Sequence, residues 1–153
     1  MSDVTAEQVE ELVASYPEIV KFGSETDAVS YDWIQKAENR LGFPLSTSYK
    51  WFIKKYGGGE IGGEEIYSIY GIDFDAVNGG DIVYQYIVGQ KNGLLEKNKV
   101  AVSETDYGEV FFFYYVSNSA EECPVYLRLP SGEEIMYSSN FFEFLYKRIK
   151  AHI

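Results

Sequence analysis

Residues 38–67 decide the fold, and they read ENRLGFPLSTSYKWFIKKYGGGEIGGEEIY. A helix ends at Leu41, because Gly42 suits the left-handed position after a helix and Pro44 prevents continuation. Ser46 can cap a second helix over residues 46–56. The apolar stripe of this second helix consists of Tyr49, Phe52, Ile53 and Tyr56. Three glycines then end the helix, and the alternation in residues 66–70 predicts a short strand.

Two helices are expected before this point. Ser30 can cap a helix over residues 30–41, with Ile34 and Ala37 on its apolar face. Further upstream, Thr5 and Gln8 can form a capping box, in which each side chain satisfies a backbone N–H of the other residue. Pro17 ends that helix, which is expected over residues 5–16.

Beyond the glycines the pattern becomes that of an antiparallel sheet with one inserted helix. Asp81 can cap a helix over residues 81–90, and strands are expected at 100–102, 110–116, 125–129 and 133–137. Residues 110–116 are apolar or aromatic throughout, which predicts a central strand covered on both faces. A closing helix begins near Ser139. The order predicts an α+β fold, in which N-terminal helices pack on a mostly antiparallel sheet and a C-terminal helix closes it.

Length and charge limit the classes of protein. The chain has 153 residues, which suits a single domain over 1–153 with residues 1–29 as a helical arm packed on it. Thirteen Lys plus Arg and 24 Asp plus Glu give a formal net charge of −11. This charge argues against direct nucleic-acid binding and against adsorption to an anionic membrane. No segment resembles a membrane span or a signal peptide, and a single cysteine fits a reducing compartment, so a cytoplasmic location is expected.

The motifs give little support for catalysis, and the chain is not expected to be an enzyme. With one cysteine and one histidine, neither a metal nor a cofactor is expected. Cys123 would need a nearby base to act as a nucleophile, but His152 lies on an end that is expected to fray. Residues 57–62 match the dinucleotide string G-x-G-x-x-G, yet they follow a helix and include an acid, so a flexible turn is the simpler explanation. Residues 73–79 resemble a calcium loop that lacks two of its ligands.

The negative charge is concentrated in two segments that contain no Lys or Arg. Between Tyr56 and Gln90 the acids are Glu60, Glu64, Glu65, Asp73, Asp75 and Asp81. Between Val100 and Leu127 they are Glu104, Asp106, Glu109, Glu121 and Glu122. Tyr67, Tyr70 and Tyr107 lie beside these acids. The pattern has two interpretations: solvated loops around a neutral helical layer with the tyrosines in the core, or an acidic, tyrosine-bearing face that meets a basic partner.

Residues 38–67, quoted at the start, also resemble a known protein family. The pattern resembles the core signature of the SUKH superfamily, the Smi/Knr-like and Syd-like proteins, over roughly residues 30–150. The positions that carry the resemblance are Glu38, Leu41, Gly42, Leu45, Tyr49, Phe52, Tyr56, Gly57, Gly58, Gly59, Ile61, Ile66 and Tyr67, followed by Ser139, Phe142, Glu143 and Leu145. The resemblance implies a SUKH-like fold for the domain.

The resemblance also implies a function. Bacterial SUKH proteins are mostly immunity proteins that bind and neutralise a cognate polymorphic toxin, often a nuclease. The family supplies no catalytic residues, and its variable surface selects the partner. The expected partner is therefore a toxin protein, with a nuclease C-terminal domain that must be positive where it holds phosphate.

The contact face is expected in the acidic, tyrosine-bearing segments. The candidate residues are Glu60, Glu64, Glu65, Tyr67, Asp73, Asp75, Asp106, Tyr107 and Glu109. Two alternatives stay open. One is a non-enzymatic regulatory scaffold that binds an endogenous protein of the cell wall or of secretion. The other is a hydrolase with two carboxylates about 5–9.5 Å apart in a cleft.

Overall fold

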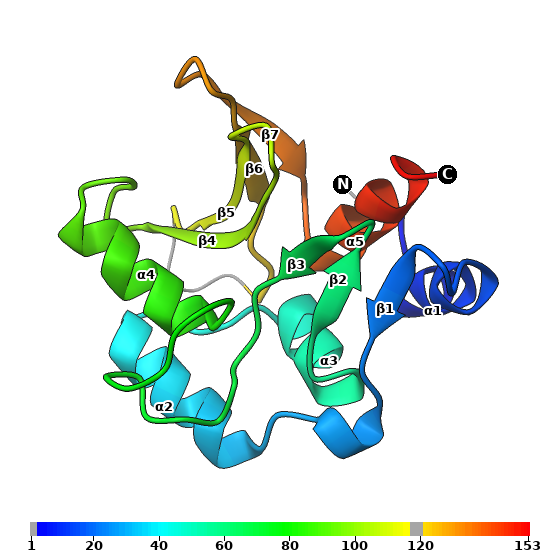
Figure 1. Cartoon of the computed structure of the whole chain (residues 1–153), viewed down its shortest axis with the longest axis horizontal. Helices are drawn as coiled ribbons and strands as arrows, with labels where there is room; N and C mark the ends of the chain where they lie inside the picture. Colours follow the sequence, from blue (N-terminus) through cyan, green and yellow to red (C-terminus); the bar gives the residue numbers. More distant parts are fainter. Residues whose placement is uncertain (1–2, 117–120) are drawn as a thin grey trace.

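The computed structural model describes residues 3–116 and 121–153, and these ranges contain five α-helices and two antiparallel sheets. Figure 1 shows how they are arranged. The elements are α1 (Ala6–Ser15), β1 (Val20–Phe22), the 3₁₀ helix η1 (Glu25–Asp27), α2 (Tyr31–Leu41), α3 (Thr47–Lys55), β2 (Gly59–Ile61), β3 (Glu64–Ile66), α4 (Ile82–Lys91), β4 (Lys99–Glu104), β5 (Val110–Tyr114), β6 (Val125–Arg128), β7 (Glu134–Ser138) and α5 (Phe141–Lys150). The predicted α+β class with a closing C-terminal helix is confirmed. No helix in the described ranges has the length and apolar character to cross a membrane.

The helix ends lie where the capping residues predict them. Gln8 N–H donates to Thr5 Oγ1 over 3.3 Å, and Thr5 N–H donates to Gln8 Oε1 over 2.8 Å, so the capping box is formed. Ser30 and Ser46 each accept a backbone N–H from the first turn of α2 and α3. Gly42 follows α2 with a φ of +82°, the left-handed conformation that favours glycine.

The strands divide into two sheets rather than one. β1, β2 and β3 form an antiparallel sheet in that order, and β4, β5, β6 and β7 form a second. β5 is an inner strand, and the prediction that it is covered on both faces is confirmed, since its phenylalanines at positions 111–113 are all buried. It ends at Tyr114, two residues earlier than predicted, and Val116 is largely exposed.

An aromatic cluster joins α3, α5 and β5 in the core. The rings of Tyr49 and Phe113 meet edge to face with centroids 5.3 Å apart, and Phe111 meets Phe144 of α5 at the same distance. Each such pair adds about 0.5–1.5 kcal/mol beyond the burial of its surface. The Tyr49 hydroxyl also donates to the carbonyl of Tyr67 over 2.8 Å. The cluster therefore holds the second sheet on the helices and reaches the boundary between the two sheets.

The prediction of a strand over residues 66–70 is wrong. β3 ends at Ile66, and the chain then leaves β2: Ser68 N–H donates to the Gly80 carbonyl, and the Ser68 carbonyl accepts from Ile82 N–H. Residues 66–69 are all buried, so their alternation does not separate a buried face from an exposed one. The alternating pattern instead reflects a segment enclosed between β4 and the start of α4.

The three glycines after α3 form a closely packed turn, not the flexible one expected. A Cβ at Gly57, whose φ is +79°, would overlap the backbone of Asp27. A Cβ at Gly58 would lie 2.7 Å from Ser68 Oγ, and one at Gly59 would overlap the backbone of β1. Each glycine thus permits contact with a different neighbouring segment. The turn is required for α3 to end and β2 to begin within so little space.

The C-terminal helix begins close to the predicted position near Ser139, but the residues after it differ from expectation. α5 starts at Phe141, and the side chain of its cap, Asn140, accepts from Glu143 N–H over 2.9 Å. His152 does not lie on a frayed end. Its Nδ1 lies 2.8 Å from the Arg148 carbonyl oxygen, and a Cβ added at Gly62 of the β2–β3 hairpin would overlap its ring.

Candidate partner-binding surface

The two acidic segments meet where β3 approaches β4. Tyr67 N–H donates to the Val102 carbonyl over 2.7 Å, and Ser103 Oγ donates to the Glu65 carbonyl over 2.9 Å. Figure 1 shows β3 and β4 adjacent at this boundary between the sheets. Acids at the end of β3 and at the end of β4 therefore belong to one region of the molecule.

Tyr67, which directly follows β3, connects this strand to Glu104 at the end of β4. Its side chain is buried, and its hydroxyl donates to Glu104 Oε2 over 2.7 Å. Burial and this hydrogen bond raise the pKa of Tyr67 well above its ordinary value, so the hydroxyl stays protonated and continues to donate. Tyr67 thus positions Glu104, a residue absent from the predicted contact face because sequence gives no signal for a bond across the two sheets.

Glu65 is held in a similar way. The Tyr70 hydroxyl donates to Glu65 Oε2 over 2.5 Å and accepts from Gly80 N–H over 2.8 Å. Burial and the hydrogen bond to Glu65 raise the pKa of Tyr70 to about 12. Gly80 leaves room for this carboxylate, since a Cβ there would overlap it. The exposed Glu65 carboxylate is therefore fixed against the loop that precedes α4.

Glu60 and Glu64 lie on opposite faces of the first sheet. Glu60 stands in register between Lys21 of β1 and Glu65 of β3, so these three residues share one face. Glu64 faces α5 and forms an ion pair with Arg148, in which the two side chains are only 17% and 12% exposed. Burial opposes the charge of Arg148, but hydrogen bonds to Glu64 and Tyr137 produce a net rise in its pKa. Glu64 therefore stabilises the fold.

The β4–β5 connection presents the remaining candidates. Thr105 Oγ1 accepts from the N–H groups of Tyr107 and Glu109 over 3.2 and 3.3 Å, and its hydroxyl lies 3.1 Å from Glu109 Oε1. Gly108 completes the turn with a φ of +81°. Asp106 is exposed, and the Tyr107 side chain projects outward at 81% exposure. A preformed turn thus displays two acids and one aromatic ring directly after Glu104.

Asp73 and Asp75 lie apart from these residues, beside α2. Asp73 Oδ1 accepts from Asp75 N–H over 2.9 Å, and Asp75 forms an ion pair with Arg40 of α2 over 2.9 Å. Asp81 is fully buried as the cap of α4, where it accepts the N–H groups of Val83 and Tyr84. We therefore use the name acidic surface for a smaller set: Glu60, Glu65, Glu104, Asp106, Tyr107 and Glu109.

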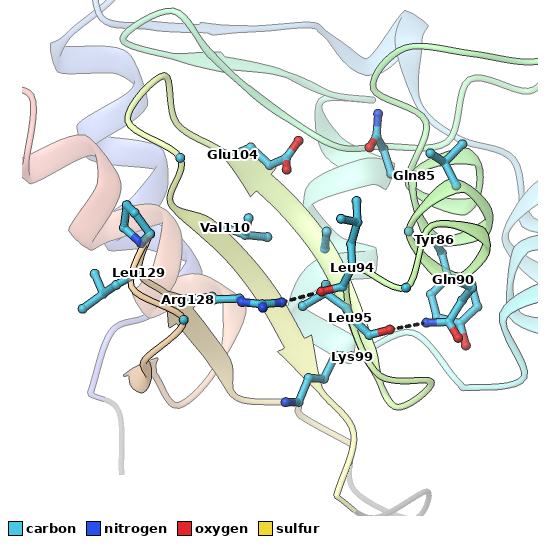
Figure 2. Close-up of a pocket in the computed structure, with 17 residues that line it drawn as sticks. Gln85, Tyr86, Gln90, Leu94, Leu95, Lys99, Glu104, Val110, Arg128 and Leu129 are labelled. Atoms are coloured by element: carbon cyan, nitrogen blue, oxygen red, sulfur yellow. Dashed lines mark hydrogen bonds between the residues drawn. The ribbon is translucent and has the colours of Figure 1, made fainter.

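A groove of about 300 Å³ lies next to the acidic surface, and sequence reasoning missed it. Figure 2 shows it between α4, the loop after α4 and the outer face of the second sheet. Glu104 and Gln85 lie at one end, Lys99 lies at the other, and Arg128 lies between them. Its volume is at the lower end of the range of ligand pockets. The sequence signal that could have indicated it is Gly89, a glycine inside a helix.

The loop that forms one wall of the groove is fixed by side chains. The four consecutive carbonyl groups of residues 94–97 all accept hydrogen bonds from the groove's other walls. Arg128 donates to the first, and Gln90 donates to the second and third over 3.0 and 3.1 Å. The Tyr86 hydroxyl donates to the fourth over 2.7 Å. The groove is therefore preformed rather than created by a ligand.

Neither a metal-ligand cluster nor an ionised thiol is found among the described residues. Within these ranges no group of three or more His, Cys, Asp or Glu side chains could hold a metal ion. Burial raises the pKa of the Cys123 thiol to about 12, so it stays protonated at neutral pH. Glu104 is the one carboxylate among the described residues that line the groove. The arrangement can present fixed negative charge and apolar surface to a partner.

The comparison with known protein families agrees with the pattern in the sequence. A SUKH family model described as SMI1-KNR4 cell-wall matches residues 31–145. The match runs from α2 into α5 and includes both the acidic surface and the groove. Since it covers most of the chain, this protein belongs to the SMI1-KNR4 family of the SUKH superfamily.

Proposed function

We propose that this chain is a cytoplasmic immunity protein that binds a cognate nuclease toxin and neutralises it by covering the toxin's basic site. The observation that carries the proposal is the acidic surface on a member of the SUKH superfamily. A nuclease must be positive where it holds the phosphate backbone. Carboxylates arranged on a protein surface can occupy the same site, and inhibition by coverage needs no catalytic group in this chain.

The carboxylates of the acidic surface are held before any partner arrives. Tyr70 holds Glu65, Tyr67 holds Glu104, and Thr105 holds the turn that carries Glu109. Binding to fixed side chains avoids about 0.5–1.5 kcal/mol of ordering cost for each mobile one. The exposed ring of Tyr107 adds contact area of the kind that is enriched in protein interfaces. These features support a binding role for the surface.

The net charge of −11 also supports rapid association. Complementary fields raise association rates by about 10–10³. An inhibitor gains from a rapid encounter, because the toxin acts until it is bound. The effect depends on long-range attraction, so the association rate should fall as the salt concentration rises.

If a toxin gene lies beside this one, as the proposal requires, co-expression with the C-terminal domain of that toxin tests the proposal. We expect the wild-type chain to restore growth and to block cleavage of nucleic acid by the purified toxin domain. Killing that continues while this chain is expressed in soluble form would refute the proposal. The absence of a toxin gene from the neighbourhood would count against it as well.

Matched charge variants test the surface itself. The test variant carries Glu60→Lys and Asp106→Lys, and the control carries Glu11→Lys and Glu18→Lys, which change the net charge equally at exposed positions in and after α1. Two reversals should weaken toxin binding by about 10–100-fold, given roughly 1 kcal/mol or more for each interfacial charge. The control should stay within about threefold of wild type. Equal affinities of the two variants would remove the acidic surface from the interface.

A second candidate rests on the description of the matching family, which names the cell wall. Under this alternative the chain is a regulatory scaffold that binds an endogenous protein. Deletion of the gene separates the two functions. Loss of an immunity protein should be harmful only in cells that meet the toxin, whereas loss of a scaffold should alter sensitivity to cell-wall stress without any toxin.

A further inference from the structure

We infer that the groove beside α4 receives a bulky apolar side chain from a segment of the partner that carries Lys or Arg next to it. This inference rests on the proposed function, because it names a second part of the same interface. It follows from three independent observations: a helical glycine, a preformed apolar groove and an uneven distribution of charge along that groove.

Gly89 is the first observation. It lies inside α4, lines the groove, and has an ordinary helical backbone, since its φ is not positive. An added Cβ would meet no atom within 4 Å, so packing does not require glycine there. Glycine inside a helix is destabilising relative to alanine. A larger side chain at this position would project into the groove, so Gly89 keeps the groove open at a cost to the helix.

The second observation is that the groove is apolar and built in advance. Val88, Leu95, Val110 and Leu129 contribute to its lining, and Leu94 leaves 56% of its surface exposed at the wall. The hydrogen bonds to the carbonyls of residues 94–97 fix that wall. Apolar surface in a preformed groove is suited to one large aliphatic or aromatic side chain, the usual anchor of a protein interface.

The third observation is the charge along the groove. Lys99 is neutralised by Glu96 and Glu134 over 2.8 and 2.6 Å, and its side chain is only 10% exposed. Arg128 is engaged with the carbonyl of Leu94 in the middle of the groove. The negative end is at Glu104, which continues into the acidic surface. A cation beside the apolar anchor therefore belongs at the Glu104 end.

The charge also decides between occupants. A second copy of this chain would bring the same net charge of −11 to a region that is already negative, which disfavours a symmetric dimer across the groove. A basic partner, the kind that the acidic surface suits, meets the opposite condition. An apolar small molecule would bind in the groove without contacting the acidic surface. The peptide titration described below distinguishes such a ligand from a basic protein segment.

Gly89→Leu is the central variant, and Gly89→Ala is its matched control. Leucine should fill the groove and weaken binding of the toxin domain by about 30-fold or more, while alanine should change it by less than about threefold. Both variants should keep or raise the melting temperature, because each replaces a helical glycine. If the wild type protects against the toxin and Gly89→Leu binds it equally well, the groove inference fails while the immunity function stands.

A second measurement does not depend on the toxin. Capped peptides Lys-Lys-Leu-Lys-Lys and Lys-Lys-Ala-Lys-Lys are titrated into the full chain and followed through amide chemical shifts. The leucine peptide should shift the amides of Gly89, Leu94 and Leu129, and the alanine peptide should shift only the acidic surface. Identical shift patterns would overturn the inference. Equal binding of the uncharged acetyl-leucine amide would also overturn it, since the groove would then be a site for a small molecule.

Discussion

Mutation of the ion pair between Glu64 and Arg148 tests whether Glu64 stabilises the folded chain, as its contacts indicate. Glu64→Ala leaves the guanidinium of Arg148, which is 12% exposed, without its carboxylate. Removal of one partner from a fully buried pair costs about 3–5 kcal/mol. Both side chains keep some exposure, and Arg148 retains the ring of Phe111, 4.7 Å from its guanidinium carbon. We therefore expect Glu64→Ala to lower the free energy of unfolding by about 2–3 kcal/mol.

Urea unfolding, followed by the fluorescence of Trp33 and Trp51, measures this loss. A chain of this size should melt about 4–12 °C lower. The double variant Glu64→Ala/Arg148→Met removes the unpaired charge as well, so it should be more stable than Glu64→Ala alone. Exposed Glu11→Ala is the control and should stay within about 0.5 kcal/mol of wild type. A Glu64→Ala loss below that value, or a double variant less stable than Glu64→Ala, would refute the reasoning.

Three further predictions address the turn, the core and the tyrosines. Gly57→Ala should lower the free energy of unfolding by about 3 kcal/mol or more in equilibrium unfolding, because the new Cβ sits at a positive φ and overlaps the Asp27 backbone. Gly42→Ala is the control: its Cβ meets no atom within 4 Å, so only the positive φ counts and the loss should be about 1–2 kcal/mol. Ser48→Ala should cost about 1–3 kcal/mol by the same method, because the fully buried Ser48 hydroxyl donates to Glu122 over 2.6 Å and accepts from Phe141 N–H over 3.0 Å; a neutral effect would contradict this network. The third prediction concerns stability at alkaline pH. Burial and the hydrogen bond to Glu65 raise the pKa of Tyr70 from 10.0 to about 12 in the folded chain. The contribution of Tyr70 to the free energy of unfolding is therefore complete below pH 10 and is lost as the pH rises toward 12. Tyr70→Phe should therefore flatten the loss of stability over that interval in unfolding curves measured at successive pH values, and an unchanged slope would contradict the assignment.

The helices could be predicted because their signals are local. Thr5, Ser30, Ser46 and Asp81 cap N–H groups within a few residues of themselves, and Gly42 ends α2 by its own backbone conformation. The first sheet depended on pairing between distant segments. β1 has only three residues, and it is recognisable as a strand only through its partner β2.

The acidic surface could be predicted only in part, for the same reason. The sequence indicates where acids accumulate, but their partners are remote: Glu64 meets Arg148 from 84 positions away, and Glu122 meets Ser48 from 74 positions away. Glu65, Asp106, Tyr107 and Glu109 stay exposed or half-exposed, and their role in binding stays a prediction. Glu104 is part of the same surface because Tyr67 donates a hydrogen bond to it, and no local sequence pattern predicts this contact.

The loop at residues 94–97 has a consequence for how this protein can diversify. Its path is held through main-chain carbonyls, which every amino acid possesses, by donors that lie outside the loop. Mutations within the loop leave all of these acceptors in place. Because Leu94 and Leu95 line the groove, exchange of these side chains would change the groove's lining, while the main-chain path of this wall would be retained. A lineage can therefore acquire new partners on an inherited backbone.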